Sequence, residues 1–381
     1  MQFHHDEDRA AFAKAVREFA RAKLLPTAVP LAHEAGYPWE LARQLADQSL
    51  LGITLPVEDG GQGGSLMDAV IAIQEVALAS PRAADVVQAG SFGAIRTVSA
   101  YATPEQKARW LPGLLEGRQL LALAMSESEA GSAVTDLATS ARQEGEEYVL
   151  NGTKLFSTHS ADATHYLVYV RYGPGVGGIG SVVVERGTPG LTVGTPHAYM
   201  SGEEWSELHF DECRIPAQDV LLGPGGFKKQ IAGFNVERIG NAARALALGR
   251  YAYEAARQHA LTREQFGKPL CEFQGLQWKF ADMAVKLDAA QLLLYRAASD
   301  ADEGLPSAYD TSVAKLACNL AGFEVASEAL QVMGAVGYST DSLVEYCLRR
   351  TRGWMIAGGS VEILKNRIAE SVFERRFDQR A

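Results

Sequence analysis

The stretch YVLNGTKLFST, residues 148–158, shows most directly how the middle of the chain folds. It opens with aromatic and β-branched residues, which are typical of a strand, and it ends with an aromatic residue followed by two hydroxyl-bearing ones. Two further runs of the same kind stand at residues 166–170 and 181–184, separated by Gly, Pro, Asn and Asp. We therefore expect a small β-domain over residues 121–225.

Helical patterns flank this β-domain on both sides. In residues 1–120, Thr103 and Gln106 have the spacing of a capping box, with Pro104 in the first turn. From residue 226 onward, long stretches rich in Ala and Leu are punctuated by glycines, as in an antiparallel bundle. The sequence thus predicts an α+β fold in three parts: an N-terminal helical domain (1–120), a middle β-barrel-like domain (121–225) and a C-terminal four-helix bundle (226–381).

The composition of the 381-residue chain narrows the classes of partner. With 36 Lys and Arg against 46 Asp and Glu, the net charge is −10, which disfavours a nucleic-acid binder. The four cysteines form no C-x-x-C pair, so we expect a reducing, cytoplasmic setting with neither a disulfide framework nor a bound metal. No apolar run approaches the length that spans a membrane, and the polar, acidic first residues do not resemble a targeting signal.

One motif is misleading. GVGGIG, residues 175–180, matches the glycine pattern of a dinucleotide-binding loop. That pattern binds a pyrophosphate only when a helix follows it, because the phosphates lie at the helix N-terminus. Here a strand is expected over residues 181–185, so the motif predicts a hairpin loop and no Rossmann fold.

Four other motifs make the chain recognisable. They are SESEAGSA at residues 126–133, NGTKLFST at 151–158, REQFGKPLCEFQ at 263–274 and QVMGAVGY at 331–338. In this order and at these distances, they resemble signatures of the acyl-CoA dehydrogenase family, and the resemblance covers essentially the whole chain. Taken singly, the first two would be indistinguishable from a flexible turn and an ordinary strand end.

The resemblance implies that FAD is bound between the β-domain and the C-terminal bundle. Ser126 is implied to contact the flavin ring and Ser132 the pyrophosphate. Phe156 is implied to wall the outer face of the ring, and Thr158 to hydrogen-bond flavin N5.

The resemblance also implies a homo-oligomer, because part of the FAD site comes from a neighbouring subunit. A tetramer, typically a dimer of dimers in this family, is expected, with a dimer as the alternative. The implied residues for the partner's phosphates and adenosine are Arg263, Phe266, Gln274 and Gln331. A guanidinium suits phosphate because it offers a fixed fork of donors. Ser360 is implied as a further cofactor contact.

The position of the catalytic base departs from the family's commonest pattern. Many relatives carry a glutamate in a C-terminal Y-E-G-T motif, which aligns here with Ala357–Ser360, so that Gly358 takes the place of the glutamate. A subgroup resembling isovaleryl- and long-chain-type enzymes places the glutamate on a helix, where this chain has Glu237. We therefore predict Glu237 as the base and the Gly358 N–H as a donor to the enolate oxygen. The simpler alternative is that Glu237 and Arg238 lie on a solvated helix face.

Other departures concern the substrate. Arg350 occupies a position where an aspartate is common in the family, and Ala133 and Ala335 also differ from the signatures. Ala357 and Gly358 are small where relatives carry Tyr and Glu, so the freed volume predicts a branched, cyclic or long acyl group.

The sequence is compatible with three classes of function. The first is α,β-dehydrogenation of an acyl-CoA to the trans-2-enoyl-CoA, with electrons passed to an electron-transfer flavoprotein, or a variant acting on a carrier-protein-tethered acyl or aminoacyl group. The second keeps the fold and FAD but carries out other chemistry, such as desulfination or enoyl-CoA reduction. The third is a helical scaffold without flavin.

Overall fold

The computed structural model describes residues 6–299 and 305–377, which form two compact units. We call Met1–His33, Ser65–Gln88 and Asn235–Ala381 the helical unit, and Glu34–Gly64 and Ala89–Phe234 the sheet unit. Two helices, α5 (Pro81–Ser91) and α8 (Phe227–Thr262), contribute residues to both units.

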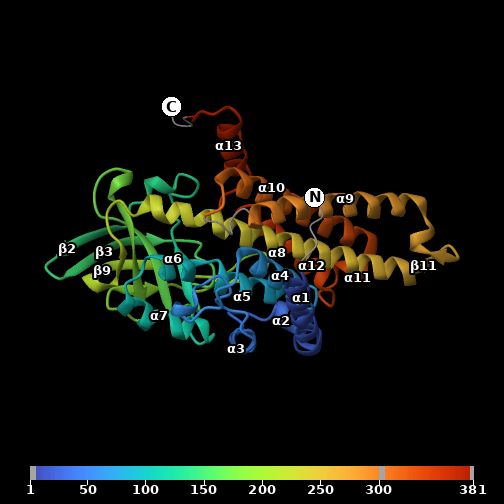
Figure 1. The fold of residues 1–381 in the computed structure, drawn as a ribbon, viewed down its shortest axis with the longest axis horizontal. Coiled ribbons are helices and arrows are strands. Elements are labelled where there is room, and N and C mark those ends of the chain that lie inside the picture. The colour runs from blue at the N-terminus through green and yellow to red at the C-terminus, as the bar shows by residue number, and fades with distance from the viewer. Residues whose placement is uncertain (1–5, 300–304, 378–381) are drawn as a thin grey trace. The chain divides into compact units, whose positions relative to one another are not determined.

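The sheet unit is built on an eight-stranded sheet with the order β10-β5-β4-β2-β3-β9-β6, in which β1 pairs with β4 (Figure 1). Its strands are β1 (Leu121–Ala124), β2 (Ser140–Glu144), β3 (Glu147–Lys154), β4 (His165–Arg171), β5 (Ile179–Glu185), β6 (Leu191–Val193), β9 (Leu208–Pro216) and β10 (Val220–Leu222). A two-stranded ladder joins β7 (His197–Ala198) to β8 (Glu204–Trp205). The three strand runs expected from the sequence lie in β3, β4 and β5. Both β4 and β5 are buried almost throughout, as their continuous apolar composition requires.

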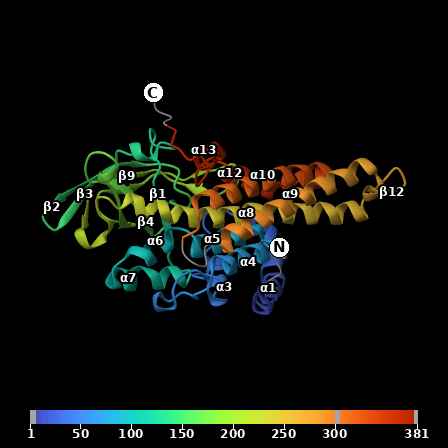
Figure 2. The same ribbon diagram turned by 45° about the horizontal axis from the view of Figure 1, so that its top comes forward.

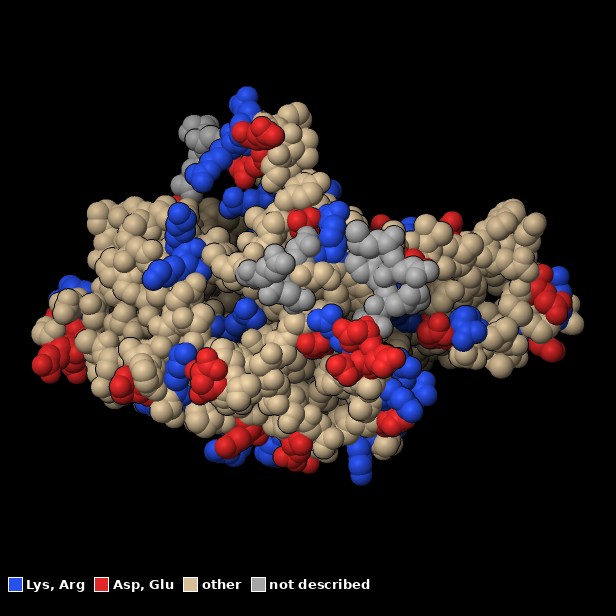
Figure 3. Space-filling view, in the orientation of Figure 1, with Lys and Arg blue, Asp and Glu red and all other residues tan. Residues whose placement is uncertain are grey.

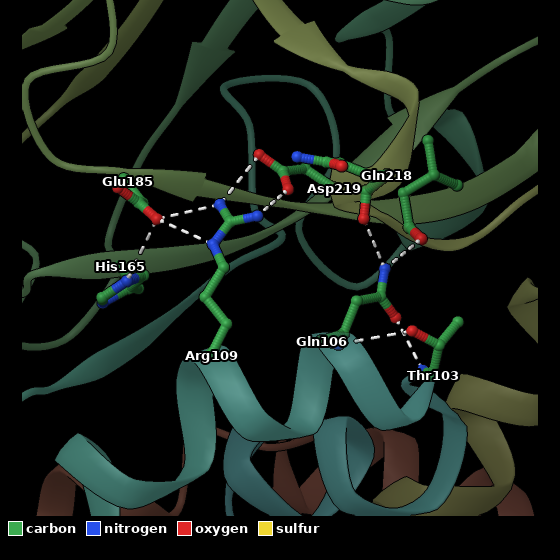
Figure 4. A network of polar contacts seen from close by, with 8 residues as sticks. Thr103, Gln106, Arg109, His165, Glu185, Gln218 and Asp219 are labelled. Atoms are coloured by element: carbon green, nitrogen blue, oxygen red, sulfur yellow. Dashed lines mark hydrogen bonds and ion pairs between the residues drawn. The ribbon is translucent and has the colours of Figure 1, made fainter.

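Three helices complete the sheet unit: α3 (Trp39–Asp47), α6 (Ala94–Tyr101) and α7 (Pro104–Leu115). The predicted capping box is confirmed, since Thr103 accepts from the Gln106 N–H while the Gln106 side chain accepts from the Thr103 N–H. Figure 4 shows how α7 is held to the sheet. Gln106 Nε2 donates to the carbonyls of Gln218 (2.7 Å) and Val220 (3.0 Å), while Arg109 pairs with Asp219 (2.6 Å) and Glu185 (2.9 Å).

The glycine-rich loop behaves as expected. A short 3₁₀ turn, Val176–Gly178, leads directly into strand β5, and no α-helix follows it. The prediction of a hairpin in place of a dinucleotide fingerprint is confirmed.

The helical unit contains the N-terminal helices and the long C-terminal ones. These are α1 (Glu7–Phe19), α2 (Ala28–His33), α4 (Leu66–Ala77), α9 (Gln274–Ser299), α10 (Ala308–Met333), α11 (Ala335–Tyr338), α12 (Leu343–Trp354) and α13 (Val361–Val372). A small hairpin of β11 (Glu264–Gln265) and β12 (Lys268–Pro269) connects α8 to α9. Figures 1 and 2 both show α9 and α10 running side by side, with the C-terminal part of α8 beside them.

A close helix crossing fixes α8 against α10. A Cβ at Gly249 would lie 2.9 Å from Gly322 Cα, and one at Gly322 would lie 2.3 Å from the Ala245 carbonyl oxygen. Glycine at both positions allows the two helix backbones to approach this closely, so the pair lets α8 and α10 pack in direct contact.

The chain therefore has an N-terminal helical domain, a middle β-domain and a C-terminal helical domain, as predicted. The boundaries at residues 120 and 225 remain a prediction, because the two compact units are defined by packing and each is discontinuous in sequence. On the face shown in Figure 3, acidic and basic side chains stand side by side. Among the described helices, none combines the length and the apolar character needed to cross a membrane.

Candidate active site

The predicted base lies where α5 and α8 meet within the helical unit. Gln88 Nε2, on α5, donates a 2.8 Å hydrogen bond to Glu237 Oε1, on α8. Glu237 Oε2 is buried and has no hydrogen-bond partner among the described residues. One carboxylate oxygen is thus fixed in place while the other is left available, so the solvated-face alternative does not describe this side chain.

Burial raises the pKa of the Glu237 carboxyl above its ordinary value. Removal from water disfavours the charged form, and this effect exceeds the opposing influence of Arg244, of the Gln88 hydrogen bond and of Lys315. A carboxylate with a raised pKa is a stronger base when it is ionised, which is the property that removal of a weakly acidic proton requires.

A second polar contact joins the same two helices. Asp85, one turn before Gln88 on α5, accepts from Arg244 (3.0 Å) and from Arg350 of α12 (2.8 Å). Both guanidinium groups lie over the ring of Trp354, at 4.7 and 4.8 Å from its centroid. Because the helix repeat places residues i and i+3 on one face, Asp85 and Gln88 together fix α5 against α8. Arg350, the departure noted in the sequence, is therefore paired with an acid from another helix.

The turn that follows α12 is held by a buried lysine. Lys315 of α10 donates to the carbonyls of Trp354 (3.1 Å) and Gly359 (2.9 Å), and Asn319 donates to the Trp354 carbonyl (2.6 Å). A cation at a helix C-terminus is favourable because the last carbonyls carry partial negative charge. These contacts position Gly358 and Gly359, whose φ angles of +69° and +94° suit glycine.

The two motifs at residues 126–133 and 151–158 meet in the sheet unit. Leu155 N–H donates to the Ser126 carbonyl (2.9 Å), Ser157 Oγ to the Leu123 carbonyl (2.6 Å) and Lys154 Nζ to the Met125 carbonyl (3.1 Å). These bonds hold the loop after β1 against the chain that leaves β3, so Ser126 and the Phe156–Thr158 segment are brought together. Ser132 lies further along the loop, exposed.

A buried ion pair anchors this loop. Lys154 Nζ lies 2.6 Å from Glu127 Oε1, with side-chain exposures of 0% and 10%. Glu127 also accepts from the backbone N–H groups of Ala138 (2.6 Å) and Thr139 (3.0 Å). Burial would raise the pKa of Glu127, but the charge of Lys154 and these donors outweigh it and lower the pKa. For Lys154, burial dominates and lowers the pKa to about 8.

Beside the loop, an aromatic surface stands open. Phe156 is 56% exposed and has a φ of +57°, an unusual conformation for a bulky residue. Its ring lies 4.5 Å from that of Trp205, and the Tyr199 hydroxyl donates to the Phe156 carbonyl (2.9 Å). The surrounding contacts thus hold a large apolar ring outward, beside the exposed Thr158.

The remaining predicted cofactor residues lie in the helical unit. Arg263 and Phe266 belong to the connection between α8 and α9, and Gln274 is the first residue of α9. All three are exposed, and Phe266 is 94% exposed at a φ of +52°. Gln331 lies exposed near the end of α10. Ser360 caps α13 by accepting from the Ile363 N–H (3.4 Å), a local role that any helix start can use.

Sequence reasoning missed several residues around Glu237: Asp85, Gln88, Arg244 and Lys315. They come from three helices, and no local motif marks them. Glu237 and Arg244 do share the i, i+7 spacing of one helix face, which is the one signal that could have pointed to a charged cluster.

Comparisons with known proteins agree with the four motifs. Three family models match successive parts of the chain: "Acyl-CoA dehydrogenase, N-terminal domain" at residues 6–118, "Acyl-CoA dehydrogenase, middle domain" at 122–213 and "Acyl-CoA dehydrogenase, C-terminal domain" at 224–373.

Relatives that align over nearly the whole chain are named for several different activities. The chain is 33% identical over 375 residues to a 3-sulfinopropanoyl-CoA desulfinase of Paraburkholderia xenovorans, covering 96% of each chain. It is 34% identical over 382 residues to an acryloyl-CoA reductase (NADH) of Anaerotignum propionicum, covering 98% of this chain and 97% of that protein. The solved structure of butyryl-CoA dehydrogenase from Megasphaera elsdenii superposes with a TM-score of 0.91 at 31% identity, covering 98% of this chain and 100% of that one.

Proposed function

Because the chain belongs to the acyl-CoA dehydrogenase family, we propose that it removes a proton and a hydride from adjacent carbons of an acyl-CoA thioester, with Glu237 as the base. The observation that carries this proposal is the Glu237 carboxylate, in which Gln88 binds Oε1 and Oε2 remains buried and unbound among the described residues. A base needs one free oxygen in a fixed orientation, and these contacts supply it.

The sheet unit offers features that fit a flavin. Phe156 presents an open aromatic face, and Thr158 and Ser132 expose hydroxyls that can donate to ring edges and phosphate oxygens. We assign Ser126, Ser132, Phe156 and Thr158 to FAD, and Arg263, Phe266, Gln274, Gln331 and Ser360 to the FAD contacts that include a neighbouring subunit. When bound, FAD would supply the acceptor for the hydride that leaves the β-carbon.

The chain's own residues carry out the removal of the α-proton. Glu237 Oε2 takes the α-proton, and Gln88 keeps the carboxylate oriented while it does so. The Gly358 N–H, held in place because Lys315 binds the neighbouring Gly359 carbonyl, donates to the thioester oxygen as negative charge develops there. Removing water from Glu237 strengthens it as a base, and Arg244 limits the rise of its pKa so that it can still ionise.

Electrons would pass from the reduced cofactor to an electron-transfer flavoprotein. A carrier-protein-tethered acyl group in place of the CoA ester is the closest variant, and a homotetramer, or a dimer, follows from the shared FAD contacts. We place the protein in the cytoplasm on the strength of its unpaired cysteines.

Glu237→Gln tests the proposal. The amide fills the same space but cannot accept the proton, so thioester-dependent bleaching of the flavin should slow by roughly 10²- to 10⁴-fold, the usual contribution of a general base. Flavin absorbance should persist in the variant, since Glu237 is not assigned to the cofactor. Glu324→Gln, which alters an exposed carboxylate on α10, is the matched control and should keep its rate.

A second candidate function is desulfination or enoyl-CoA reduction, favoured by the absence of a carboxylate at Gly358 and by the names of two relatives. Such an enzyme would not need a base at Glu237. Full turnover by Glu237→Gln on 3-sulfinopropanoyl-CoA or acryloyl-CoA, with flavin retained, would establish this reading and reject the dehydrogenase. A colourless protein would reject both.

A further inference from the structure

The β7–β8 hairpin of the sheet unit, residues 197–205, places three aromatic side chains on one face. His197 stands directly opposite Trp205 in the ladder, and Tyr199 joins them because side chains two residues apart point to the same side of a strand. The ring centroids of His197 and Tyr199 lie 5.2 and 6.1 Å from that of Trp205. Trp205 also contacts Phe156, whose ring centroid lies 4.5 Å away. The hairpin therefore presents an aromatic surface to a residue assigned to the flavin.

The hairpin is closed by its own contacts. The Tyr199 N–H donates to the Glu203 carbonyl (2.8 Å), and the Gly202 N–H donates to the Tyr199 carbonyl (2.9 Å). Gly202 has a φ of +97°, a conformation that glycine adopts without strain. The Ser201 hydroxyl donates to the Glu203 carboxylate, and both side chains are buried. A turn with these internal bonds can hold Tyr199 and Trp205 in fixed positions.

Phe156 needs such support because its backbone is held in an uncommon conformation. Its φ of +57° lies in the left-handed region, which a bulky residue seldom occupies. Relaxation of φ to the ordinary negative range would turn the Cα–Cβ bond and move the ring from its outward position. The direction of the exposed ring therefore depends on contacts that hold the residue against this relaxation.

Three contacts of this kind come from the hairpin. The Tyr199 hydroxyl donates to the Phe156 carbonyl at 2.9 Å, and the Trp205 ring lies against the Phe156 ring. Two residues further on, Thr158 forms an antiparallel bridge with Trp205. The hairpin thus holds Phe156 by its carbonyl, by its ring and by the chain that follows it. Phe156 stays 56% exposed with these contacts in place, so a large part of its ring is available to a ligand.

We infer that Trp205 and Tyr199 are positioning residues for the flavin, which act through Phe156. Trp205 sets the tilt of the Phe156 ring, and Tyr199 holds the carbonyl of the strained residue. This inference rests on the proposed function, in which Phe156 faces the flavin, and it names the residues that keep that face in place. Both residues lie outside the motifs at 126–133 and 151–158, so the sequence motifs do not mark them.

The FAD affinity of the full-length chain tests the inference. Dilution of the flavin-loaded protein releases FAD, and the fluorescence of the free FAD gives the dissociation constant. Trp205→Ala removes the ring pair and should weaken FAD binding roughly twofold to tenfold, as expected for one aromatic contact. Trp205→Phe keeps a ring in this place and should restore most of the affinity. Unchanged affinity in Trp205→Ala would overturn the inference.

A double-mutant cycle distinguishes positioning from a merely structural role. In the Phe156→Ala background, Trp205→Ala should change the FAD dissociation constant little further, because the ring through which Trp205 acts is already missing. The same fold-change in both backgrounds would show that Trp205 acts on the fold and not through Phe156, and it would reject the inference.

Tyr199→Phe tests the second positioning residue with a milder change, and it keeps the inference testable if Trp205→Ala fails to fold. The variant retains the ring but loses the donor to the Phe156 carbonyl, so FAD binding should weaken roughly twofold to tenfold. Tyr148→Phe is the matched control, since it removes an exposed hydroxyl that bonds Gln143 in the same unit, and it should bind FAD as the wild type does. Equal changes in the two variants would reject the role of Tyr199.

The same measurement separates this inference from the proposed function. A wild-type chain that binds no FAD would reject the proposed function. A wild-type chain that binds FAD, with equal affinity in Trp205→Ala and Tyr199→Phe, would leave the proposed function standing and reject the inference alone.

Discussion

Each unit of the molecule buries a glutamate and a lysine, and the two pairs are built in opposite ways. In the sheet unit, Lys154 and Glu127 touch at 2.6 Å, and backbone donors satisfy the rest of the carboxylate. In the helical unit, Lys315 binds backbone carbonyls, and Glu237 keeps one oxygen without a partner among the described residues.

The difference between the two pairs indicates which buried carboxylate can exchange a proton. Full pairing lowers the pKa of Glu127, and its carboxylate is committed to holding a loop. Separation from Lys315 leaves burial dominant at Glu237 and raises its pKa, so that carboxylate can exchange a proton. Burial is deeper at Glu237 than at Glu127, and the two carboxylates also differ in how many of their acceptor sites are already in use.

The largest effect is expected from breaking the paired site. Lys154→Met removes the cation and leaves the Glu127 carboxylate buried without its partner, so the free energy of unfolding should fall by about 3–5 kcal/mol. Urea unfolding, followed by fluorescence at fixed protein concentration, measures the change.

Lys315→Met is the matched comparison. It gives up two hydrogen bonds to carbonyls but also removes a cation that lacks a carboxylate within 4.0 Å among described residues, so the loss should be smaller. Equal losses of unfolding free energy in the two variants would mean that ion pairing does not account for the difference between the two sites.

The next effect concerns orientation of the free carboxylate. Gln88→Ala removes the donor to Glu237 Oε1, and loss of a hydrogen bond to a charged group costs about 1.5–3 kcal/mol, or roughly a tenfold to hundredfold slower flavin reduction. Because Gln88 favours the ionised form, its loss should also move the rising limb of the pH–rate profile to higher pH.

Gln74→Ala is the control for that change. Gln74 is a part-buried glutamine of the same unit, and its amide donates to Gln291 at 2.8 Å, away from the carboxylate. A similar pH shift in both variants would show that Gln88 has a merely structural role.

Gln88 illustrates what sequence alone could and could not supply. The strands, the capping box at Thr103 and the three-part fold follow from local patterns, and the structure confirms them. Glu237 could be singled out because a known motif has a carboxylate there. Gln88 and Asp85 lie about 150 residues away on another helix, and only the packing of α5 on α8 brings them near. Contacts of that kind between distant helices produce no periodic or local pattern in the sequence.

The glycine-rich loop is a case in which local sequence was sufficient. GVGGIG matches the sequence pattern of a dinucleotide-binding loop, but the element that follows it is a strand and not a helix, which excludes that structure. Context within ten residues was sufficient there, whereas the charged side chains that act on Lys315 of α10 come from another helix, α8.

A smaller effect is expected in the pH dependence of stability. The raised pKa of Glu237 means that the native state binds more protons than the unfolded chain above the ordinary carboxyl pKa of about 4.3, so its contribution to stability falls as pH rises through that window. Glu127 has a lowered pKa, so its contribution is present above pH 4.3 and is lost as pH falls.

Unfolding free energies measured from about pH 3 to pH 7 test both signs. Relative to the wild type, Glu237→Gln should gain stability as pH rises above about 4.3, by at most about 1.4 kcal/mol per pH unit. Glu127→Gln should lose relative stability as pH rises toward about 4.3, and by less, because Glu127 reaches solvent in part. Slopes of the same sign would contradict the contrast between the sites.

The smallest effect is expected at an ion pair that is neither buried nor hydrogen-bonded to backbone groups. Lys286 of α9 and Glu324 of α10 approach to 2.6 Å, but their side chains remain 48% and 46% exposed. Water screens such charges, and holding two long side chains together costs conformational entropy, so Glu324→Ala should change the free energy of unfolding by less than about 1 kcal/mol. The shift should shrink further in high salt. A loss comparable to that of Lys154→Met would show that contact distance sets the strength of these pairs. The expected gap ties the strength to burial, which is also the property that makes Glu237 available as a base.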